Sequence, residues 1–231
     1  MPVNIYGRRC NMEKIMEIAH EYNLNVVEDC AEAHGVRPIG DISCFSLFAN
    51  KIISAGEGGI CLTNDLKLAE QMKHLRAMAF NKEHTFLHKK LAYNFRMTNV
   101  QAAIARAQVE RIEEILLKRR KIEQIYDSLL FEVDGVQLMP KRDVLWYYDI
   151  LVEDREDLIK FLESNGIETR VFFKPMSQQP MYYNPSWKLL NATRFATKGI
   201  YIPTYTDLSS EDQVFIAEKI KEFYKTRRGN E

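Results

Sequence analysis

The sequence has little that would direct the chain to nucleic acid, to a membrane or to an oxidising compartment. Its 32 basic residues equal its 32 acidic residues, so no net charge attracts a polyanion. The opening segment MPVNIYGRRC lacks the apolar core of a signal peptide, and no apolar run approaches the roughly 18 residues of a membrane helix. These absences predict a cytoplasmic, globular protein that binds neither nucleic acid nor a membrane.

Cysteine is also sparse and scattered. The four cysteines form no C-x-x-C pair and have no accompanying histidines; they are Cys10, Cys30, Cys44 and Cys61. This spacing indicates neither a zinc site nor a disulfide framework. We therefore expect reduced, partly buried packing residues and no metal.

The apolar pattern predicts α/β layering in the first half of the chain. With 231 residues and 46% hydrophobic content, the chain can bury a core in one large domain or two small ones. Asn11 is a plausible N-cap for the first helix. The expected elements are a helix over Asn11–Tyr22, strands at Leu24–Val27, Ile42–Phe48 and Gly59–Leu62, and an amphipathic helix over residues 65–78.

A long helical region from about Thr98 to Leu130 is predicted to be a spine between two domains. After Gly135 the pattern is typical of a small α+β domain. Its expected elements are strands at Trp146–Val152 and Thr169–Phe173 and helices at Arg155–Asn165 and Ser210–Lys225. The predicted domains are residues 1–107 and 108–231.

Three polar positions follow the predicted strands of the first half. Asp29 ends a strand, where ligands collect in open α/β sheets, although a cap or turn acid is the commoner role of such a residue. Lys51 lies between a buried strand and the turn Gly56–Gly59, where an amine loses its charge more easily, as imine formation requires. Ser46 could bind a phosphate oxygen. The alternatives are a solvated lysine, a serine bonded to backbone and an ordinary glycine turn.

Together these segments are more specific than any one of them. The motifs are E-D-C-A-E-A-H-G (28–35), F-S-L-F-A-N-K (45–51), G-E-G-G (56–59), Y-N-F-R-M-T-N-V-Q-A-A-I (93–104), A-Q-V-E-R-I (107–112), T-R-V-F-F-K-P-M (169–176), Q-P-M-Y (179–182) and I-P-T (202–204). In this order they closely resemble the DegT/DnrJ/EryC1/StrS family of sugar aminotransferases. The resemblance covers nearly the whole chain.

The resemblance implies a type I pyridoxal-phosphate (PLP) aminotransferase fold, with a large, mainly parallel sheet domain and a small C-terminal domain. Lys51 matches the lysine that binds PLP covalently and moves the proton in both half-reactions, and Asp29 matches the acid that pairs with the pyridine nitrogen. Relatives with histidine in place of this lysine are sugar dehydratases, so Lys51 favours transamination.

Other positions match family residues around the cofactor and the sugar. Ala31 matches a small residue against one cofactor face, and Ser46 matches a phosphate-binding hydroxyl. Asn94 matches an asparagine that reaches the phosphate across a dimer interface, so a homodimer with shared sites is implied. Candidate substrate contacts are Glu32, Arg96 and Arg170.

The implied reaction moves an amino group from L-glutamate to a nucleotide-linked 4-keto-6-deoxy sugar of the perosamine or viosamine type, as in deoxyamino-sugar biosynthesis for polysaccharides. The motifs do not choose the nucleotide. Two other functions stay open: a non-catalytic or regulatory binding protein on the same scaffold, and a PLP aminotransferase acting on a non-nucleotide cyclic ketone.

The sequence departs from the family pattern at its start and after Gly35. Family members usually carry roughly 100 or more residues before the segment that matches Pro2–Gly7, enough for a domain's worth of structure. On this comparison we expect the large sheet domain to be incomplete, to lack part of the cofactor cradle and to expose apolar edges. A fragment, a misplaced start codon and a truncated, inactive gene product are the alternatives. The connection 34–41 is also shorter than in relatives.

Overall fold

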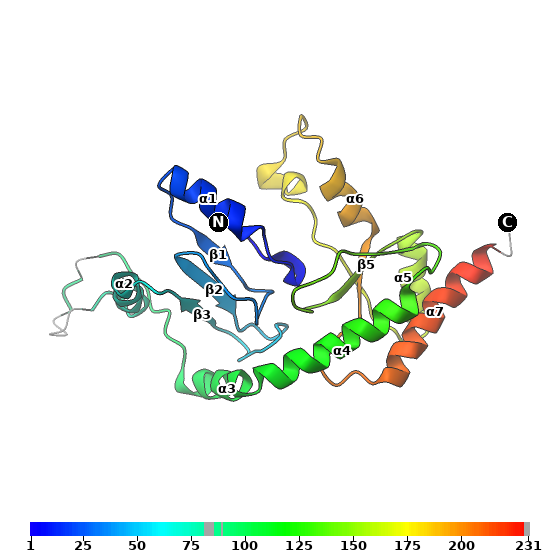
Figure 1. Cartoon of the computed structure of the whole chain (residues 1–231), viewed down its shortest axis with the longest axis horizontal. Coiled ribbons are helices and arrows are strands. Elements are labelled where there is room, and N and C mark those ends of the chain that lie inside the picture. Colours follow the sequence, from blue (N-terminus) through cyan, green and yellow to red (C-terminus); the bar gives the residue numbers. More distant parts are fainter. Residues whose placement is uncertain (81–85, 89, 229–231) are drawn as a thin grey trace. The chain divides into compact units, whose positions relative to one another are not determined.

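The computed structural model describes residues 1–80, 86–88 and 90–228, and this part of the chain divides into compact units (Figure 1). The first unit is Met1–Leu116 with Arg142–Val144, and the second unit is Leu117–Lys141 with Leu145–Glu231. The boundary between these units, after Leu116, therefore lies later in the chain than the domain boundary expected after Ala107. A functional division at residue 107 stays a prediction.

The sheet of the first unit runs in the order β1-β2-β3 within the described residues. Its strands are β1 (Val27–Asp29), β2 (Ile42–Ser46) and β3 (Gly59–Leu62). β1 is parallel to β2, whereas β3 is antiparallel to β2. The chain start lies beside β1 in parallel, because the Asp29 N–H donates to the Pro2 carbonyl at 2.9 Å.

The strand expected at Leu24–Val27 was placed too early. Leu24 is exposed, and its N–H donates to the Ala19 carbonyl at 2.8 Å, which closes the end of the preceding helix. The Val26 N–H donates to the Asp41 carboxylate at 2.6 Å. The apolar run therefore belongs partly to a helix-ending turn, and β1 begins only at Val27.

Side-chain caps define where the helices of the first unit begin. The N-cap predicted for α1 (Met12–Glu21) is confirmed, because Asn11 Oδ1 accepts from the Lys14 N–H at 3.2 Å. Helix α1 lies along one side of the sheet, where Met12 and Ala19 pack with Val26 (Figure 1). The short 3-10 turn η1 (Ile5–Gly7) precedes α1, and α2 (Leu66–Arg76) follows its own cap, Asp65.

The long helical region expected from Thr98 to Leu130 is interrupted. It consists of α3 (Asn99–Glu110), which starts with a capping box between Thr98 and Gln101, and α4 (Ile112–Leu130). Between them Arg111 leaves helical geometry, with ψ of 7°, and its N–H bonds the Gln108 carbonyl at 3.2 Å. Such a tightened last turn is typical of a helix end.

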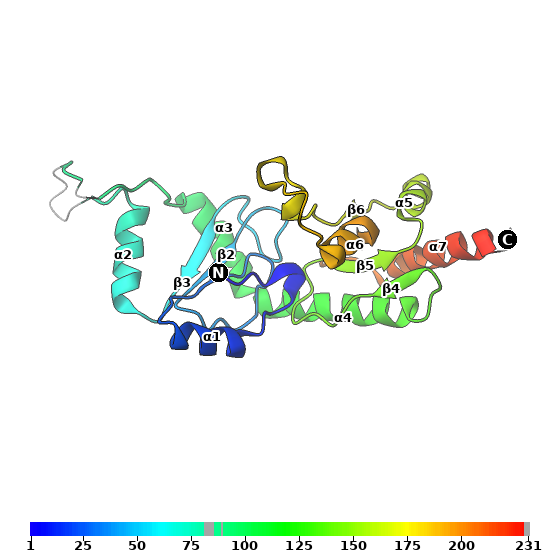
Figure 2. The same cartoon turned by 90° about the horizontal axis from the view of Figure 1, so that it is seen from above.

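The second unit contains an antiparallel sheet in the order β4-β5-β7-β6 over its described residues. Figure 2 labels β4, β5 and β6 of this sheet. The strands are β4 (Val136–Leu138), β5 (Tyr148–Val152), β6 (Arg170–Val171) and β7 (Gly199–Ile202). The helices are α5 (Arg155–Ser164), α6 (Leu190–Lys198) and α7 (Ser210–Arg228), with short turns η2 (Met176–Gln178) and η3 (Pro180–Tyr182). The predicted β5, β6, α5 and α7 are present with small shifts, whereas β4, β7 and α6 were not predicted.

Strand alternation divides the apolar residues of the second unit between the two faces of its sheet. Tyr148, Ile150 and Val152 on β5 face the helices α4, α5 and α7 and form the main core with them. Helix α6 contacts β5 and β7. The second unit therefore has a core of its own.

This core gives a direct test of the fold. Leu162 on α5 has no exposed surface, so Leu162→Ala should lower the free energy of unfolding by about 2–5 kcal/mol. Leu190 on α6 is 79% exposed, and Leu190→Ala should change the free energy of unfolding by less than about 0.5 kcal/mol. Denaturant unfolding followed by circular dichroism measures both, and equal effects would contradict the assigned core.

Candidate functional site

The first unit brings Asp29 and Ser46 to the ends of neighbouring parallel strands. Asp29 is the last residue of β1, and Ser46 is the last residue of β2. Asp29 pairs with Cys44 in the register, so Asp29, Cys44 and Ser46 lie on one face of the sheet. Asp29 Oδ1 accepts from the Ala31 N–H at 3.0 Å, and Ser46 Oγ accepts from the Phe48 N–H at 3.2 Å. Both turns that follow the strands are therefore held by these side chains.

Lys51 and Glu32 meet next to these strand ends. Lys51 Nζ lies 3.7 Å from Glu32 Oε1, and the two side chains are only 11% and 13% exposed. The other carboxylate oxygen, Oε2, accepts from the Tyr6 N–H at 2.8 Å. Glu32 is thus fixed from one side by backbone while its second oxygen faces the amine.

Burial shifts both groups toward their neutral forms. Loss of water lowers the pKa of Lys51, although the charges of Glu32 and Asp29 oppose that change. Loss of water also raises the pKa of Glu32, against the Tyr6 N–H and the Lys51 charge. Burial therefore brings the pKa of Lys51 and the pKa of Glu32 closer together than those of an exposed lysine and glutamate.

A cavity of about 230 Å³ lies over the strand ends, among the described residues. Its lining includes Asp29, Ala31, Ser46 and Gly58. Gly58 has φ of +128°, and a Cβ at this position would lie 2.9 Å from Cε of Met97. The positive φ favours glycine at this position, and the missing side chain leaves room for Met97.

A buried carboxylate that sequence reasoning missed holds the loop after β1. Glu28 has no exposed surface, and its Oε1 accepts from the backbone N–H groups of Ile39, at 2.6 Å, and Gly40. The Ser43 hydroxyl donates to the same oxygen at 3.4 Å. These bonds fix the far end of the loop that carries Ala31 and Glu32. Strand alternation is the sequence signal that could have identified Glu28, because it points this side chain to the face opposite Asp29.

The remaining predicted residues lie elsewhere. Asn94 and Arg96 are exposed and bond each other, because Asn94 Oδ1 accepts from Arg96 Nε at 3.1 Å. Arg170 belongs to the second unit, where it pairs with Glu168 at 3.2 Å. The contacts of the first unit therefore bring Asp29, Ala31, Glu32, Ser46 and Lys51 into one region, without Asn94 and Arg96.

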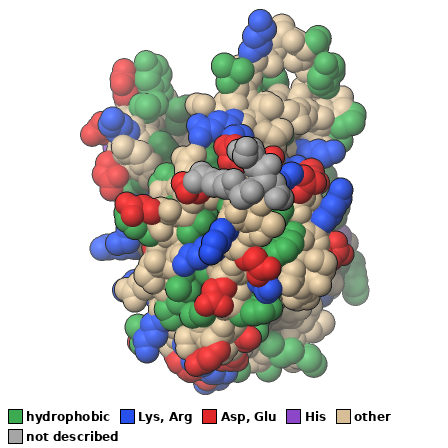
Figure 3. Space-filling model, turned by 90° about the vertical axis from the view of Figure 1, so that its right-hand side faces the viewer, with side chains coloured by type: hydrophobic (Ala, Val, Ile, Leu, Met, Phe, Trp, Pro, Cys, Tyr) green, Lys and Arg blue, Asp and Glu red, His purple; other side chains and the backbone are tan. Residues whose placement is uncertain are grey.

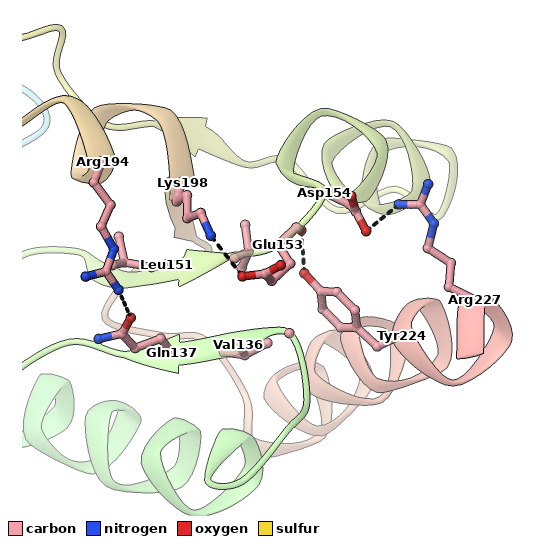
Figure 4. Close-up of a pocket in the computed structure, with 11 residues that line it drawn as sticks. Val136, Gln137, Leu151, Glu153, Asp154, Arg194, Lys198, Tyr224 and Arg227 are labelled. Carbon is pink, nitrogen blue, oxygen red and sulfur yellow. Dashed lines mark hydrogen bonds and ion pairs between the residues drawn. The ribbon is translucent and has the colours of Figure 1, made fainter. Parts of the chain in front are cut away.

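The second unit has a hollow of about 360 Å³ (Figure 4). Two of its cations are paired with carboxylates: Lys198 with Glu153 at 2.9 Å and Arg227 with Asp154 at 2.9 Å. Arg194 donates to the side-chain carbonyl of Gln137 at 2.6 Å. Because most of its charge is compensated, this hollow is a weaker anion site than its cations alone suggest.

The face drawn in Figure 3 carries no dominant charge. On this face, Lys and Arg side chains lie among Asp and Glu side chains.

Among the described helices, none is long and apolar enough to cross a membrane. Over the same residues, His, Cys, Asp and Glu side chains do not gather in threes as a metal site would require.

Comparison with known proteins shows extensive similarity. The model of the DegT/DnrJ/EryC1/StrS aminotransferase family matches residues 1–221. The GDP-perosamine synthases of Escherichia coli O157:H7 and Caulobacter vibrioides are 38% and 36% identical, over 98% and 92% of this chain. The chain spans only 66% and 62% of the lengths of those relatives.

Solved structures agree with the fold prediction. The structure of DesV from S. venezuelae has a TM-score of 0.88 and 26% identity, over 96% of this chain and 63% of DesV. Helicobacter pylori PseC, an aminotransferase of pseudoaminic acid biosynthesis, has a TM-score of 0.89 at 24% identity, over 97% of this chain and 66% of its own. The expected type I aminotransferase fold is confirmed. This chain belongs to the DegT/DnrJ/EryC1/StrS aminotransferase family.

Proposed function

We propose that the protein is a PLP-dependent aminotransferase that transfers an amino group from L-glutamate to a nucleotide-linked 4-keto-6-deoxy sugar of the perosamine or viosamine type. The observation that carries this proposal is the buried pair of Lys51 and Glu32 beside Asp29. A lysine whose pKa is lowered by burial is the group that covalent amine chemistry requires.

The residues around the cavity fit the chemistry of PLP. Asp29 offers a carboxylate for a protonated ring nitrogen, and Ser46 offers a hydroxyl for the phosphate. When bound, PLP would supply an electron sink for the bond that breaks at the substrate Cα. Ala31, which also lines the cavity, adds little bulk to it.

The chain's own groups would then move the proton. Lys51 Nζ, when neutral, can take a proton from the substrate Cα and return one in the second half-reaction. Glu32 Oε1, 3.7 Å away, can hold the proton while Nζ is neutral. The Tyr6 N–H keeps that carboxylate oriented through Oε2. The charge of Asp29 acts on the pKa of Lys51 in the same direction as the charge of Glu32.

The substrate class is supported by the named relatives. Proteins named GDP-perosamine synthase from Escherichia coli O157:H7, Caulobacter vibrioides and Vibrio cholerae share 38%, 36% and 32% identity with this chain. Glu32, Arg96 and Arg170 are the proposed substrate contacts. A cytoplasmic location stays a prediction.

A regulatory function is the second candidate. A protein of Geobacillus stearothermophilus named pleiotropic regulatory protein is 31% identical over 97% of this chain. In that case the scaffold would act by binding, without turnover. A substitution of Lys51 distinguishes the two functions, because only transamination depends on the Lys51 amine.

A homodimer with shared sites is also part of the proposal. Large apolar side chains between residues 86 and 104 of the first unit are exposed: Phe86, Leu91, Phe95, Val100 and Ile104. Exposed apolar groups gathered in this way favour a protein interface. Asn94 and Arg96 lie in the same segment, so a second copy covering it would also meet these polar side chains.

Lys51→Ala tests the proposed chemistry. It should abolish the visible absorbance of bound PLP and lower transamination of a panel of nucleotide keto sugars by at least about 100-fold, because base and attachment point are lost together. Lys73→Ala removes an exposed, paired lysine and should change neither. Absorbance absent from the unsubstituted chain, with keto-sugar binding retained, would favour the regulatory function.

Glu32→Gln tests the buried pair. The carboxylate charge raises the pKa of Lys51, so the neutral amide should lower that pKa further. The pH dependence of Lys51 acetylation, followed by peptide mass spectrometry, should shift to lower pH. Glu70→Gln is the matched control, since its partner Lys73 is exposed and solvent screens the pair. A midpoint that stays in place or rises would argue against the pair.

Phe95→Asp tests the interface. Phe95 is 71% exposed, so an aspartate there should leave the fold intact and shift the chain from dimer to monomer in sedimentation velocity. Leu66→Asp, at a position that is 82% exposed on α2, should leave the dimer unchanged. A dimer that persists in Phe95→Asp would show that this segment does not carry the interface.

A further inference from the structure

Two cysteines face each other across β2 and β3. Cys44 pairs with Cys61 in the antiparallel register, and their Sγ atoms are 3.8 Å apart. Leu47 N–H donates to the Gly58 carbonyl at 2.9 Å, so the pair 47/58 is hydrogen-bonded. Bonded and non-bonded pairs alternate along such a ladder, which makes Cys44/Cys61 a non-hydrogen-bonded pair.

Non-hydrogen-bonded pairs have the geometry that a disulfide needs. Their Cα atoms lie about 4.5 Å apart, within the roughly 4.4–6.8 Å range of disulfides. The geometry points to Cys44 and Cys61 as a reversible dithiol–disulfide site of the first unit. This site does not depend on the proposed transaminase function.

The two thiols differ in access, which sets the order of the reaction. Cys61 is exposed and Cys44 is half-buried. Burial raises the pKa of the Cys44 thiol to about 11, and the neighbouring Cys61 and Asp29 act in the same direction. Cys61 is therefore the group that an oxidant meets first, and Cys44 is the resolving thiol.

The oxidant required is a low-molecular-weight disulfide such as oxidised glutathione. The Cys61 thiolate attacks one sulfur of that disulfide, and one glutathione leaves as its thiolate. Cys44 then loses its proton and attacks Cys61 Sγ, which releases the second glutathione. Two protein thiols are oxidised to one disulfide, and one external disulfide is reduced to two thiols.

The bond would close a covalent ring around part of the candidate site. The ring from Cys44 to Cys61 contains Ser46, Lys51 and the glycine turn at 56–59. Cys44 also lines the same cavity as Asp29 and Ser46. Oxidation would therefore restrict the segment that carries the lysine; the importance of this restriction for catalysis, unlike the bond itself, rests on the proposed function.

The reduced full chain in glutathione redox buffers tests the site. After acid quenching and alkylation, we expect a reversible product that lacks two hydrogen atoms, in which the Cys44 peptide is linked to the Cys61 peptide. Ring closure should be faster at higher pH, because the Cys44 thiol must lose its proton. Cys10→Ser should behave like the unsubstituted chain, whereas Cys44→Ser should stop at a glutathione adduct on Cys61.

Peptide mapping of the unsubstituted chain gives the decisive result without relying on any variant. A stable glutathione adduct at Cys61 with no ring would overturn the proposal, as would a link through Cys10 or Cys30. Proteolysis between residues 47 and 58 should be several-fold slower in the oxidised chain. Equal cleavage in both redox states would overturn the effect on the candidate site.

Discussion

The candidate site depends on the burial of one amine beside one carboxylate, Lys51 and Glu32. Taking two charges out of water costs more free energy than a pair at 3.7 Å is expected to return. The pair is therefore a poor source of stability. The value that we propose for the pair is chemical, because the same burial brings the pKa of the amine and the pKa of the carboxylate closer together, while the charge of Asp29 also acts on Lys51.

The surrounding fold keeps this pair in place mainly through backbone bonds. Strand alternation sends Glu28 and Asp29 to opposite faces of β1. Glu28 fixes the end of the loop that carries Glu32, and the Tyr6 N–H fixes the carboxylate of Glu32 itself. Lys51 is held by its own N–H, which donates to the Phe48 carbonyl at 3.0 Å. Each side of the pair thus depends on a different loop.

The sequence predicted those elements whose signals are local. The cap at Asn11 and the bounds of β3 (Gly59–Leu62) follow from side-chain chemistry and a glycine turn, and the structure has both. The start of β1 was misjudged because the apolar run also ends a helix. β7 (Gly199–Ile202) was missed although its apolar run Ile200–Ile202 is a local strand signal, whereas its pairing with β5 joins segments far apart in the chain. No local signal reports such a register.

The site shows the same division. The motifs indicated that Asp29, Ser46 and Lys51 lie in one region, whereas the hydrogen bonds to Glu28 that hold the neighbouring loop come from tertiary packing.

The most direct test of the proposed chemistry is borohydride reduction of the chain with bound PLP, followed by peptide mass mapping. The pyridoxyl mass should be found on Lys51. A label on other lysines, or spread over exposed ones with Lys51 unmodified, would contradict the assignment of Lys51 as the reacting amine.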